Sequence, residues 1–379
     1  MGDHDTIQAS CPMLGDDERE AVSRVLDSGR LGGNGPEVEA FERELASAFG
    51  AARAVAVSSG TAALFLALSQ YVRPGDHVLT SPITFFATCE AIIACGAVPV
   101  FCDVDNAGQM DVDAAEAAIC SNGKITAVCP VHMYGSMVDV RDLVAICAQH
   151  GLSVIEDACQ AHGAHYVSTW QYAGTIGNYG AMSFYATKHI TTLGEGGAIF
   201  CREDSPVDPL LSMRTHGMSG YDSHICHGWN WRMTEAAAAV GRVQLQRFVK
   251  GAQDSRREQC NAIIADIMGL EYLDVLAAPD GVQHGYFWLP VYIDDMAHAK
   301  GFKAHMREAG VEVRQRYTTP VYRQPIMRKA FGSEYVKAQV AECPNAERLM
   351  PRVFGLPTKA SMTDEEVARI IHAVRSYRP

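Results

Sequence analysis

Short apolar runs recur through the first half of the chain, and polar or glycine-containing segments separate them. Within a run the apolar residues are continuous rather than alternating, which is typical of strands that are covered on both faces. The pattern predicts seven strands, which begin near residues 54, 77, 98, 125, 152, 181 and 197.

Helical spacing fills the gaps between the earlier runs, for example in residues 61–71 and 138–151. Strands that alternate with helices form a parallel sheet with helices packed against it. We therefore expect an α/β fold with a seven-stranded, mostly parallel sheet and helices on both faces. No helix separates the runs near residues 181 and 197, so the sheet is expected to end in at least one irregular or antiparallel strand.

The pattern changes on either side of this unit. Pro36 stands where the first turn of a helix tolerates proline, which predicts an N-terminal helical arm. Beyond a long helix at 233–268, strands and amphipathic helices mix. We predict a large domain, residues 1–245, and a small C-terminal α+β domain, residues 246–379. Because no low-complexity linker joins them, we expect the two domains to share a fixed interface.

Composition and charge exclude several classes of function. The chain has 379 residues and a formal net charge of -12, which argues against binding to nucleic acid or an anionic membrane. We find no targeting signal, and the apolar runs are too short to span a bilayer. The twelve cysteines are scattered without a C-x-x-C pair, as in reduced cytoplasmic proteins that hold no structural zinc. We expect a cytoplasmic protein without a metal site.

Ligands of an open parallel sheet bind beyond the carboxyl ends of its strands. Gly60 and Thr61 follow the first predicted strand and open a helix. The free N–H groups and the positive end of that helix attract an anion such as phosphate. Many strand-to-helix turns contain glycine and bind nothing, so this motif alone does not decide the question.

Three further residues each allow a structural and a functional interpretation. Asp157 ends a buried strand, where it could cap the next turn or face a cation in a cleft. Phe85 could belong to the core or present a flat face to a ring. Lys188 lies between an aromatic segment and a glycine cluster, where it could be an exposed loop residue or a buried amine that acts as a nucleophile.

One cofactor needs these four features together. Pyridoxal phosphate has a phosphate for the helix end and a ring nitrogen whose protonated form a buried aspartate favours. Its aldehyde forms a Schiff base with a lysine. The segment from Asp157 to Lys188 is long enough to carry the chain from one strand end to a neighbouring one. The combination therefore favours a pyridoxal phosphate site.

Several blocks of the sequence, in order, resemble the DegT/StrS-type aminotransferases. These are pyridoxal-phosphate enzymes of fold type I that act on keto-sugars and keto-cyclitols. The resemblance covers nearly the whole chain. It rests on "GPEVEAFERELASAFGA", "VSSGTAALFLAL", "SPITFFATCEAIIACGAVPVFCDVD", "VHMYGSMVDV", "VIEDACQAHGAHY", "SFYATKHITTLGEGGAIF" and "WNWRMTEAAAAVGRVQL".

The resemblance implies a role for each matched residue. Lys188 forms the Schiff base and shuttles a proton between the donor carbon and the cofactor, and Asp157 pairs with the pyridine nitrogen. Phe85 stacks on the ring, and Gln160 lies near its hydroxyl group. The phosphate is held by Gly60, Thr61 and Ser183 of one subunit and by Asn230 of a second. The working unit implied is a homodimer, or a larger assembly, with shared active sites.

The chain also departs from the family pattern. His189 follows the lysine where the family usually has asparagine, and Leu193 is an extra residue before "GEGG". The segment "PVYR" (320–323) is closest to the cyclitol and aminobenzoate branches, whereas "SFYATKHITT" is closer to the nucleotide-sugar enzymes. The candidate substrate residues are Tyr317, Tyr322 and Arg323.

The activity implied is the transfer of an amino group from L-glutamate or L-glutamine to a keto-sugar, foremost a nucleotide-linked keto-deoxysugar. Such a reaction belongs to amino-sugar, antibiotic or polysaccharide biosynthesis. A keto-cyclitol (inosose) acceptor is the first alternative. A lyase or dehydratase fits less well, because family dehydratases replace the lysine with histidine. A non-catalytic binding protein on the same scaffold would not need Lys188 and Asp157.

One histidine cluster has the spacing of a metal site. His224 and His227 flank Cys226, but no carboxylate or second cysteine completes the set. A loop that precedes Asn230 is the simpler interpretation.

Overall fold

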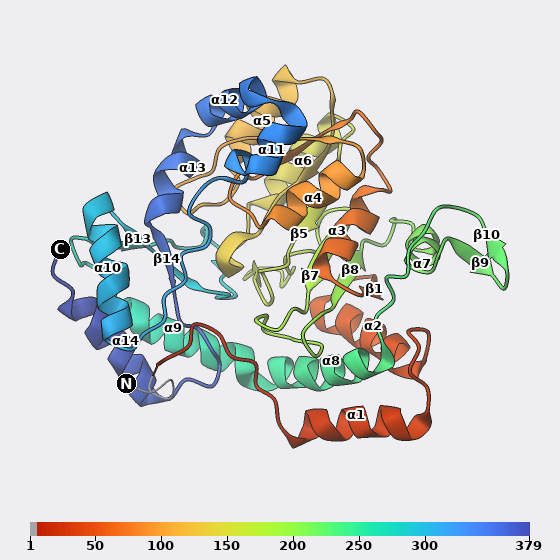
Figure 1. Ribbon diagram of the computed structural model, residues 1–379, viewed down its shortest axis with the longest axis horizontal. Coiled ribbons are helices and arrows are strands. Elements are labelled where there is room, and N and C mark those ends of the chain that lie inside the picture. The colour runs from red at the N-terminus through yellow and green to blue at the C-terminus, as the bar shows by residue number, and fades with distance from the viewer. Residues whose placement is uncertain (1–5) are drawn as a thin grey trace.

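The computed structural model describes residues 6–379. All seven predicted strands are present, as β1 (Arg53–Val57), β2 (His77–Thr80), β3 (Val98–Phe101), β4 (Ile125–Cys129), β5 (Ser153–Asp157), β7 (Tyr179–Ser183) and β8 (Gly197–Cys201). They form one sheet in the order β1-β8-β7-β5-β4-β2-β3 (Figure 1). The strands from β7 to β3 pair in parallel, whereas β8 is antiparallel to both of its neighbours.

The antiparallel strand does not end the sheet, so the prediction was wrong about its place. β8 lies inside the sheet between β7 and β1, and β1 takes the edge. The loop from β7 to β8 contains no helix, so the chain returns directly beside β7 in the opposite direction. β1 then pairs with the free side of β8, from Arg53 opposite Cys201 to Val57 opposite Gly197.

Helices cover both faces of the sheet, which confirms the predicted α/β fold. Successive side chains of a strand point to opposite faces, so Ala54 and Ala56 pack into one core while Val55 and Val57 pack into the other. The first core includes α2 (Pro36–Phe49), α5 (Val112–Ser121), α6 (Val140–Gln149) and α8 (Glu235–Arg247). The second includes α3 (Gly60–Leu68), α4 (Phe86–Ala94) and α7 (Asp208–Arg214).

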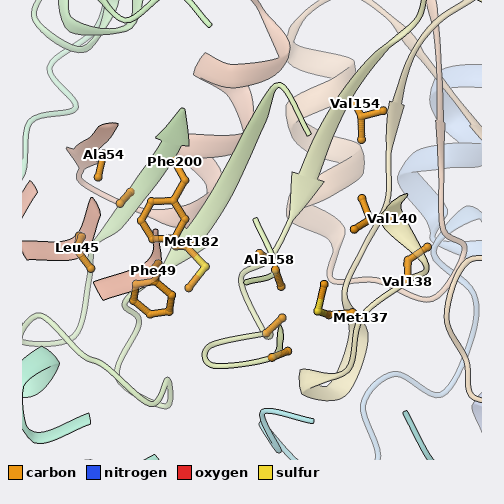
Figure 2. Close-up of a cluster of buried hydrophobic side chains, with 14 of the residues drawn as sticks. Leu45, Phe49, Ala54, Met137, Val138, Val140, Val154, Ala158, Met182 and Phe200 are labelled. Atoms are coloured by element: carbon orange, nitrogen blue, oxygen red, sulfur yellow. The ribbon is translucent and has the colours of Figure 1, made fainter. Parts of the chain in front are cut away.

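Figure 2 shows part of the first core. Phe49 of α2 lies beside Phe200 of β8 and Met182 of β7, and the Phe49 and Phe200 ring centroids are 5.2 Å apart. Full burial of such side chains contributes roughly 1.5–3 kcal/mol each. This packing holds the strand ends in place beneath the cavity described below.

The N-terminal arm runs beneath the large unit (Figure 1). Its helix α1 (Asp16–Ser28) packs along α8. Glu18 is buried there and accepts a hydrogen bond from Gln244 Nε2 at 2.7 Å. Ahead of α1, Ile7 pairs with Val311, which follows α10 (Met296–Glu308) in the C-terminal part. The N-terminal segment therefore contacts both the large unit and the C-terminal part.

The long helix predicted at 233–268 is interrupted. Gly251, with φ 129°, lies in a π-helical turn (Phe248–Ala252) between α8 and α9 (Gln253–Ile267). The predicted boundary at residue 245 falls near the C-terminal end of α8.

The C-terminal part has its own antiparallel sheet in the order β11-β13-β14. Its strands are β11 (Leu273–Val275), β13 (Leu289–Ile293) and β14 (Val353–Leu356). Helices α10 (Met296–Glu308) and α14 (Asp364–Ser376) pack with α9 against this sheet, around Phe302.

The remaining short elements connect these units. They are β6 (His165–Tyr166), β12 (Val282–Gln283), the hairpin β9 (Met218–Gly220) and β10 (Ser223–His224), the helices α11 (Pro325–Phe331), α12 (Ser333–Glu342) and α13 (Pro344–Leu349), and the 3-10 turns η2 (Met133–Gly135), η4 (Val321–Arg323) and η5 (Met350–Arg352). No helix in residues 6–379 is long and apolar enough to cross a membrane.

A fully buried carboxylate fixes the end of β5. Glu156 Oε2 accepts hydrogen bonds from His132 Nε2 at 2.8 Å and from the Gly174 N–H at 2.8 Å. Its Oε1 accepts from the N–H groups of Ile176 and Gly177 at 2.7 and 2.6 Å. Burial alone would raise the pKa of Glu156, but the His132 hydrogen bond and charge and these backbone donors lower it below its ordinary value.

We expect Glu156→Ala to lower the free energy of unfolding by about 3 kcal/mol, because it leaves four buried donors without an acceptor. Thermal denaturation of the variant and of a matched exposed-site control, Glu116→Ala, measures the difference. Equal melting temperatures for the two variants would contradict this structural role.

Candidate active site

A cavity of about 400 Å³ lies beyond the carboxyl ends of β1, β2, β5 and β7. The topology brings there most of the residues singled out in the sequence. Its lining includes Gly60, Thr61, Phe85, Asp157, Gln160, Ser183, Lys188 and Tyr317.

The start of α3 forms one end of this cavity. Ser59 caps the helix, because its Oγ accepts a hydrogen bond from the Ala62 N–H at 3.1 Å. A Cβ atom on Gly60 would lie only 2.8 Å from Ser183 Cβ and 3.0 Å from Cys159 Sγ, so this close packing requires glycine. The first-turn N–H groups have no acceptor within the helix and face the cavity end. This geometry suits an anion.

Asp157 lies at the end of β5, and its side chain is 6% exposed. Oδ2 accepts a hydrogen bond from Thr88 Oγ1 of α4 at 2.7 Å, and Oδ1 accepts from the Cys159 N–H at 3.2 Å. The second bond belongs to a local turn, whereas the first aims the carboxylate across the cavity floor. A carboxylate held in this way can face a ligand cation.

Lys188 is half-buried in the same cavity. Its Nζ lies 4.2 Å from the centroid of the Phe287 ring and makes no hydrogen bond or ion pair with any residue in 6–379. Burial lowers the pKa of this amine below its ordinary value, although the neighbouring Cys159 and Asp157 oppose the shift. A lysine with a lowered pKa has more of the neutral, nucleophilic form.

The loop between β7 and β8 places this lysine. The Phe184 N–H donates to the Gly196 carbonyl at 2.8 Å, and the Ala186 N–H donates to the Gly194 carbonyl at 3.1 Å. The Lys188 N–H donates back to the Tyr185 carbonyl at 2.9 Å. Leu193, the extra residue, has φ 63° and lies exposed at the bend of this loop.

His189 is turned away from the cavity. Its Nε2 donates to the Tyr286 carbonyl at 3.2 Å, and its ring centroid is 5.6 Å from that of His162. Burial lowers the pKa of His189 well below its ordinary value, and that of His162 to about 3. Both rings are therefore neutral at physiological pH. Neither nitrogen of His162 has a hydrogen-bond partner among the described residues.

Aromatic side chains form one wall of the cavity. Phe85 is 58% exposed and stacks on Tyr317, with ring centroids 6.0 Å apart and an interplanar angle of 30°. Phe287 and Trp288 join the lining from the segment before β13. The cavity is thus enclosed by the large sheet on one side and by the C-terminal part on the other.

Gln160 has one fixed partner. Its Oε1 accepts a hydrogen bond from the Tyr134 N–H at 3.2 Å. Since the carbonyl end is engaged, the amide nitrogen is the end that can donate to a ligand.

Three predicted residues lie outside the cavity. The Tyr322 side chain is fully buried between Phe101 of β3 and the C-terminal part, where its hydroxyl donates to Glu347 Oε1 at 2.8 Å. Arg323 Nε donates to the same oxygen at 2.7 Å. The 3-10 turn η4 directs both side chains toward α13, so neither shapes the cavity of this chain. Asn230 is exposed and pairs with Thr215, also away from the cavity.

The histidine cluster lies on the exposed β9–β10 hairpin, which projects from the body (Figure 1). His224 Nδ1 is 2.8 Å from the His216 carbonyl oxygen. Within residues 6–379 no group of three or more histidine, cysteine, aspartate or glutamate side chains is placed to hold a metal ion.

Several lining residues were not predicted. The lining residues Phe287, Trp288 and Arg316 come from the C-terminal part, whereas Thr88 of α4 holds Asp157 without lining the cavity. Only Thr88 stood near a recognised motif, two residues after Phe86, and its spacing along a helix could have indicated it. The others depend on how the C-terminal part folds over the sheet.

The lowered pKa of Lys188 has a consequence for stability. The unfolded chain binds the proton more readily than the folded chain, so the ammonium destabilises the fold. The loss in free energy of unfolding is largest at a pH below the pKa of Lys188 in the folded protein. It disappears as the pH rises toward the ordinary pKa value of 10.5. We expect Lys188→Met to raise the melting temperature of the cofactor-free protein at pH 7, by an amount that shrinks toward about pH 10.

Thermal denaturation across this pH range tests the expectation. Exposed Lys124 provides the matched control, because Lys124→Met removes the same charge without relieving burial. A Lys188→Met variant that is no more stable than the control at pH 7 would contradict the buried, destabilising amine.

Known proteins share this architecture over its full length. The Bacillus subtilis spore coat polysaccharide biosynthesis protein SpsC is 35% identical, with 97% of this chain and 95% of that protein aligned. The UDP-N-acetyl-3-dehydro-alpha-D-glucosamine 3-aminotransferase of Acidithiobacillus ferrooxidans is 32% identical over 97% of this chain and 96% of its own.

A crystal structure shows the same fold. Streptomyces venezuelae DesV, in complex with a ketimine intermediate, superposes with a TM-score of 0.88 and 29% identity, covering 97% of this chain and 98% of its own. Residues 12–375 match the DegT/DnrJ/EryC1/StrS aminotransferase family. The resemblance seen in the sequence is confirmed, and this chain belongs to the DegT/DnrJ/EryC1/StrS family of aminotransferases.

Proposed function

We propose that this chain uses pyridoxal phosphate to move an amino group from L-glutamate or L-glutamine to the ketone of a nucleotide-linked keto-sugar. Aminotransferases of this family depend on that cofactor. The observation that carries the proposal is the placement of Lys188 and Asp157 in one cavity, with the start of α3 at its end.

The residues of the cavity fit the cofactor. The start of α3, at Gly60 and Thr61, lines the cavity and offers free backbone N–H groups to a phosphate. The carboxylate of Asp157 is fixed by Thr88 and suits a protonated ring nitrogen. The amine of Lys188 has no partner of its own among the described residues, so it is free for a covalent bond.

Each side chain then has a defined task. When bound, the cofactor supplies an aldehyde that links to amines and a ring that withdraws electrons from the donor carbon. Asp157 holds a proton on the ring nitrogen, and Lys188 moves a proton to and from the donor carbon through its Nζ. Phe85 presents its exposed face to the ring, and Tyr317 covers that side against water.

Phosphate binding is assigned to Gly60, Thr61 and Ser183. Gln160 is assigned to the ring hydroxyl, because its amide nitrogen is the free end. These contacts fix the orientation of the cofactor so that one face meets Lys188.

The choice of acceptor follows from two observations. Relatives that align over nearly the whole chain include an aminotransferase named for a UDP-linked keto-sugar. The residues that favoured a cyclitol, Tyr322 and Arg323, are engaged with Glu347 outside the cavity. We therefore propose a nucleotide-linked keto-sugar, rather than an inosose, as the acceptor of the amino group. Half-reactions with each donor, followed by a panel of both acceptor classes, test the choice.

The assembly is proposed to be a homodimer with shared sites. Asn230 is exposed and pairs with Thr215, and these two residues flank the β9–β10 hairpin in the sequence, so Asn230 is open to contact with a second subunit. We also retain the division at residue 245, because the cavity lies between the sheet and the C-terminal part.

Lys188→Ala should abolish the visible absorption band that arises from the lysine–cofactor linkage. Amino transfer should fall by at least roughly 10²- to 10⁴-fold, because the group that moves the proton is lost. Absorption spectra and glutamate half-reactions measure the two effects, with Lys124→Ala as the control. Retained turnover in Lys188→Ala would remove the central assignment.

A mixed-subunit experiment tests the shared site. Lys188→Ala and Asn230→Ala are each expected to impair both sites of their own homodimer. Random pairing of the two chains makes about half of the dimers mixed, and one of the two sites in each mixed dimer has both wild-type residues. Co-expression should therefore restore about a quarter of the wild-type sites. Activity no higher than the average of the parents would show that Asn230 does not act across subunits.

A further inference from the structure

The short segment before β13 borders the cavity and is held by its own carbonyl groups. The Gly285 carbonyl accepts a hydrogen bond from Gln253 Nε2 at 2.8 Å, and the Phe287 carbonyl accepts one from Thr358 Oγ1 at 3.0 Å. The residue between them, Tyr286, has φ 54°, a left-handed conformation that non-glycine residues rarely adopt. Contacts from outside the segment must therefore hold it in this shape.

A third side chain reaches the segment from the loop that carries Lys188. The Tyr286 carbonyl accepts a hydrogen bond from His189 Nε2 at 3.2 Å. A carbonyl oxygen can only accept, so Nε2 carries the single proton of this neutral ring. Nδ1 has no hydrogen-bond partner among the described residues. The one N–H group of the ring is therefore used on the Tyr286 carbonyl.

Two consecutive residues of the loop contact two consecutive residues of the segment. While His189 holds the Tyr286 carbonyl, Lys188 Nζ lies 4.2 Å from the centroid of the Phe287 ring. The His189 ring also packs beside Phe287, with ring centroids 6.2 Å apart. The place of the Phe287 ring relative to the amine is thus set by a contact from the loop of the amine itself.

The Phe287 ring covers one side of the Lys188 amine. The face of an aromatic ring attracts a cation, but burial is the largest effect on the pKa of Lys188 and lowers it. Asp157 and Cys159, from the end of β5 and the turn after it, oppose this shift, and His162 beside them is neutral. A ring that stays in place keeps water from the amine, whereas a mobile ring would admit it.

We propose that His189 is a positioning residue that holds the Phe287 ring over Lys188 Nζ and so keeps water away from the amine. The inference rests on the proposed function, in which Lys188 is the reacting group. It gives a task to the histidine that stands where the family usually has asparagine. The side chain of asparagine ends one atom short of the position of Nε2, so it would not reach the Tyr286 carbonyl from the same backbone.

His189→Leu tests the proposal, because it keeps an apolar group in the buried site and removes the donor. Trace acetylation of the cofactor-free protein with acetic anhydride reports on the Lys188 amine, since only the neutral amine reacts. Peptide mass spectrometry from about pH 6 to about pH 11 gives the midpoint of this reaction. We expect the midpoint to rise by about one pH unit in His189→Leu, because water reaches the amine. His189→Gln, whose amide nitrogen can donate to the same carbonyl, should restore most of the wild-type value.

A matched histidine separates positioning from a general loss of stability. His305 Nε2 donates to the Ala373 carbonyl at 2.9 Å, between α10 and α14. His305→Leu removes a bond of the same kind, so it should lower the melting temperature and leave the midpoint of Lys188 unchanged. Exposed Lys124 serves as the internal standard of labelling in every sample.

A double variant shows whether His189 acts through the ring. Phe287→Ala should itself raise the midpoint of Lys188, because it uncovers the amine. Adding His189→Leu to Phe287→Ala should then change the midpoint little, since a residue that acts through another has no separate effect once the other is removed.

Each outcome decides the question. An unchanged midpoint in His189→Leu overturns the proposal, and so does a shift of equal size with and without the Phe287 ring. If His189→Leu gives too little folded protein, His189→Asn replaces it with the same expected rise. Labelling needs neither cofactor nor turnover, so its result is independent of amino transfer. A wild-type protein that accepts no amino group from any donor would instead contradict the proposed function.

Discussion

The site depends on the half-buried amine of Lys188, which has no hydrogen-bond or ion-pair partner in residues 6–379. The buried carboxylates of Glu156 and Glu18, by contrast, accept hydrogen bonds from neighbouring donors. Lys188 has only the face of Phe287 against its Nζ, and its pKa is lowered by burial. An uncompensated cation destabilises the fold. The packing of the surrounding sheet must therefore offset this cost.

The pleat of strand β5 places two adjacent carboxylates in different surroundings. Glu156 and Asp157 are adjacent, so their side chains point to opposite faces. Glu156 faces inward and is saturated by four donors, which fix the loop around Gly174. Asp157 faces the cavity with two bonds and spare acceptor capacity. The structural carboxylate thereby holds the strand end that aims the functional one.

The sequence was sufficient for features that depend on local pattern. Continuous apolar runs predicted all seven strands, and the residues after those runs include Gly60, Asp157 and Lys188, which the fold brings to one cavity. Features set by tertiary pairing were not predictable in the same way. The place of β8 depends on which strand covers its free side, and β1 does so from the start of the chain.

The same limit applies to individual side chains. Tyr317 and Tyr322 are five residues apart, yet one lines the cavity and the other is buried in the core. The difference depends on Glu347 of α13, which accepts a hydrogen bond from the Tyr322 hydroxyl and so holds this side chain in the core. No spacing rule within residues 317–323 contains that information.

Two parts of the fold supply the walls of the cavity. Lys188, Asp157 and Gly60 belong to the large sheet, where parallel strands fix their relative positions. Arg316, Tyr317 and Trp288 come from the C-terminal part. The two parts meet where Phe85 stacks on Tyr317 and where Lys188 Nζ lies against the Phe287 ring. A substitution in the C-terminal part can therefore change one wall of the cavity while the strand ends keep Lys188, Asp157 and Gly60 in place.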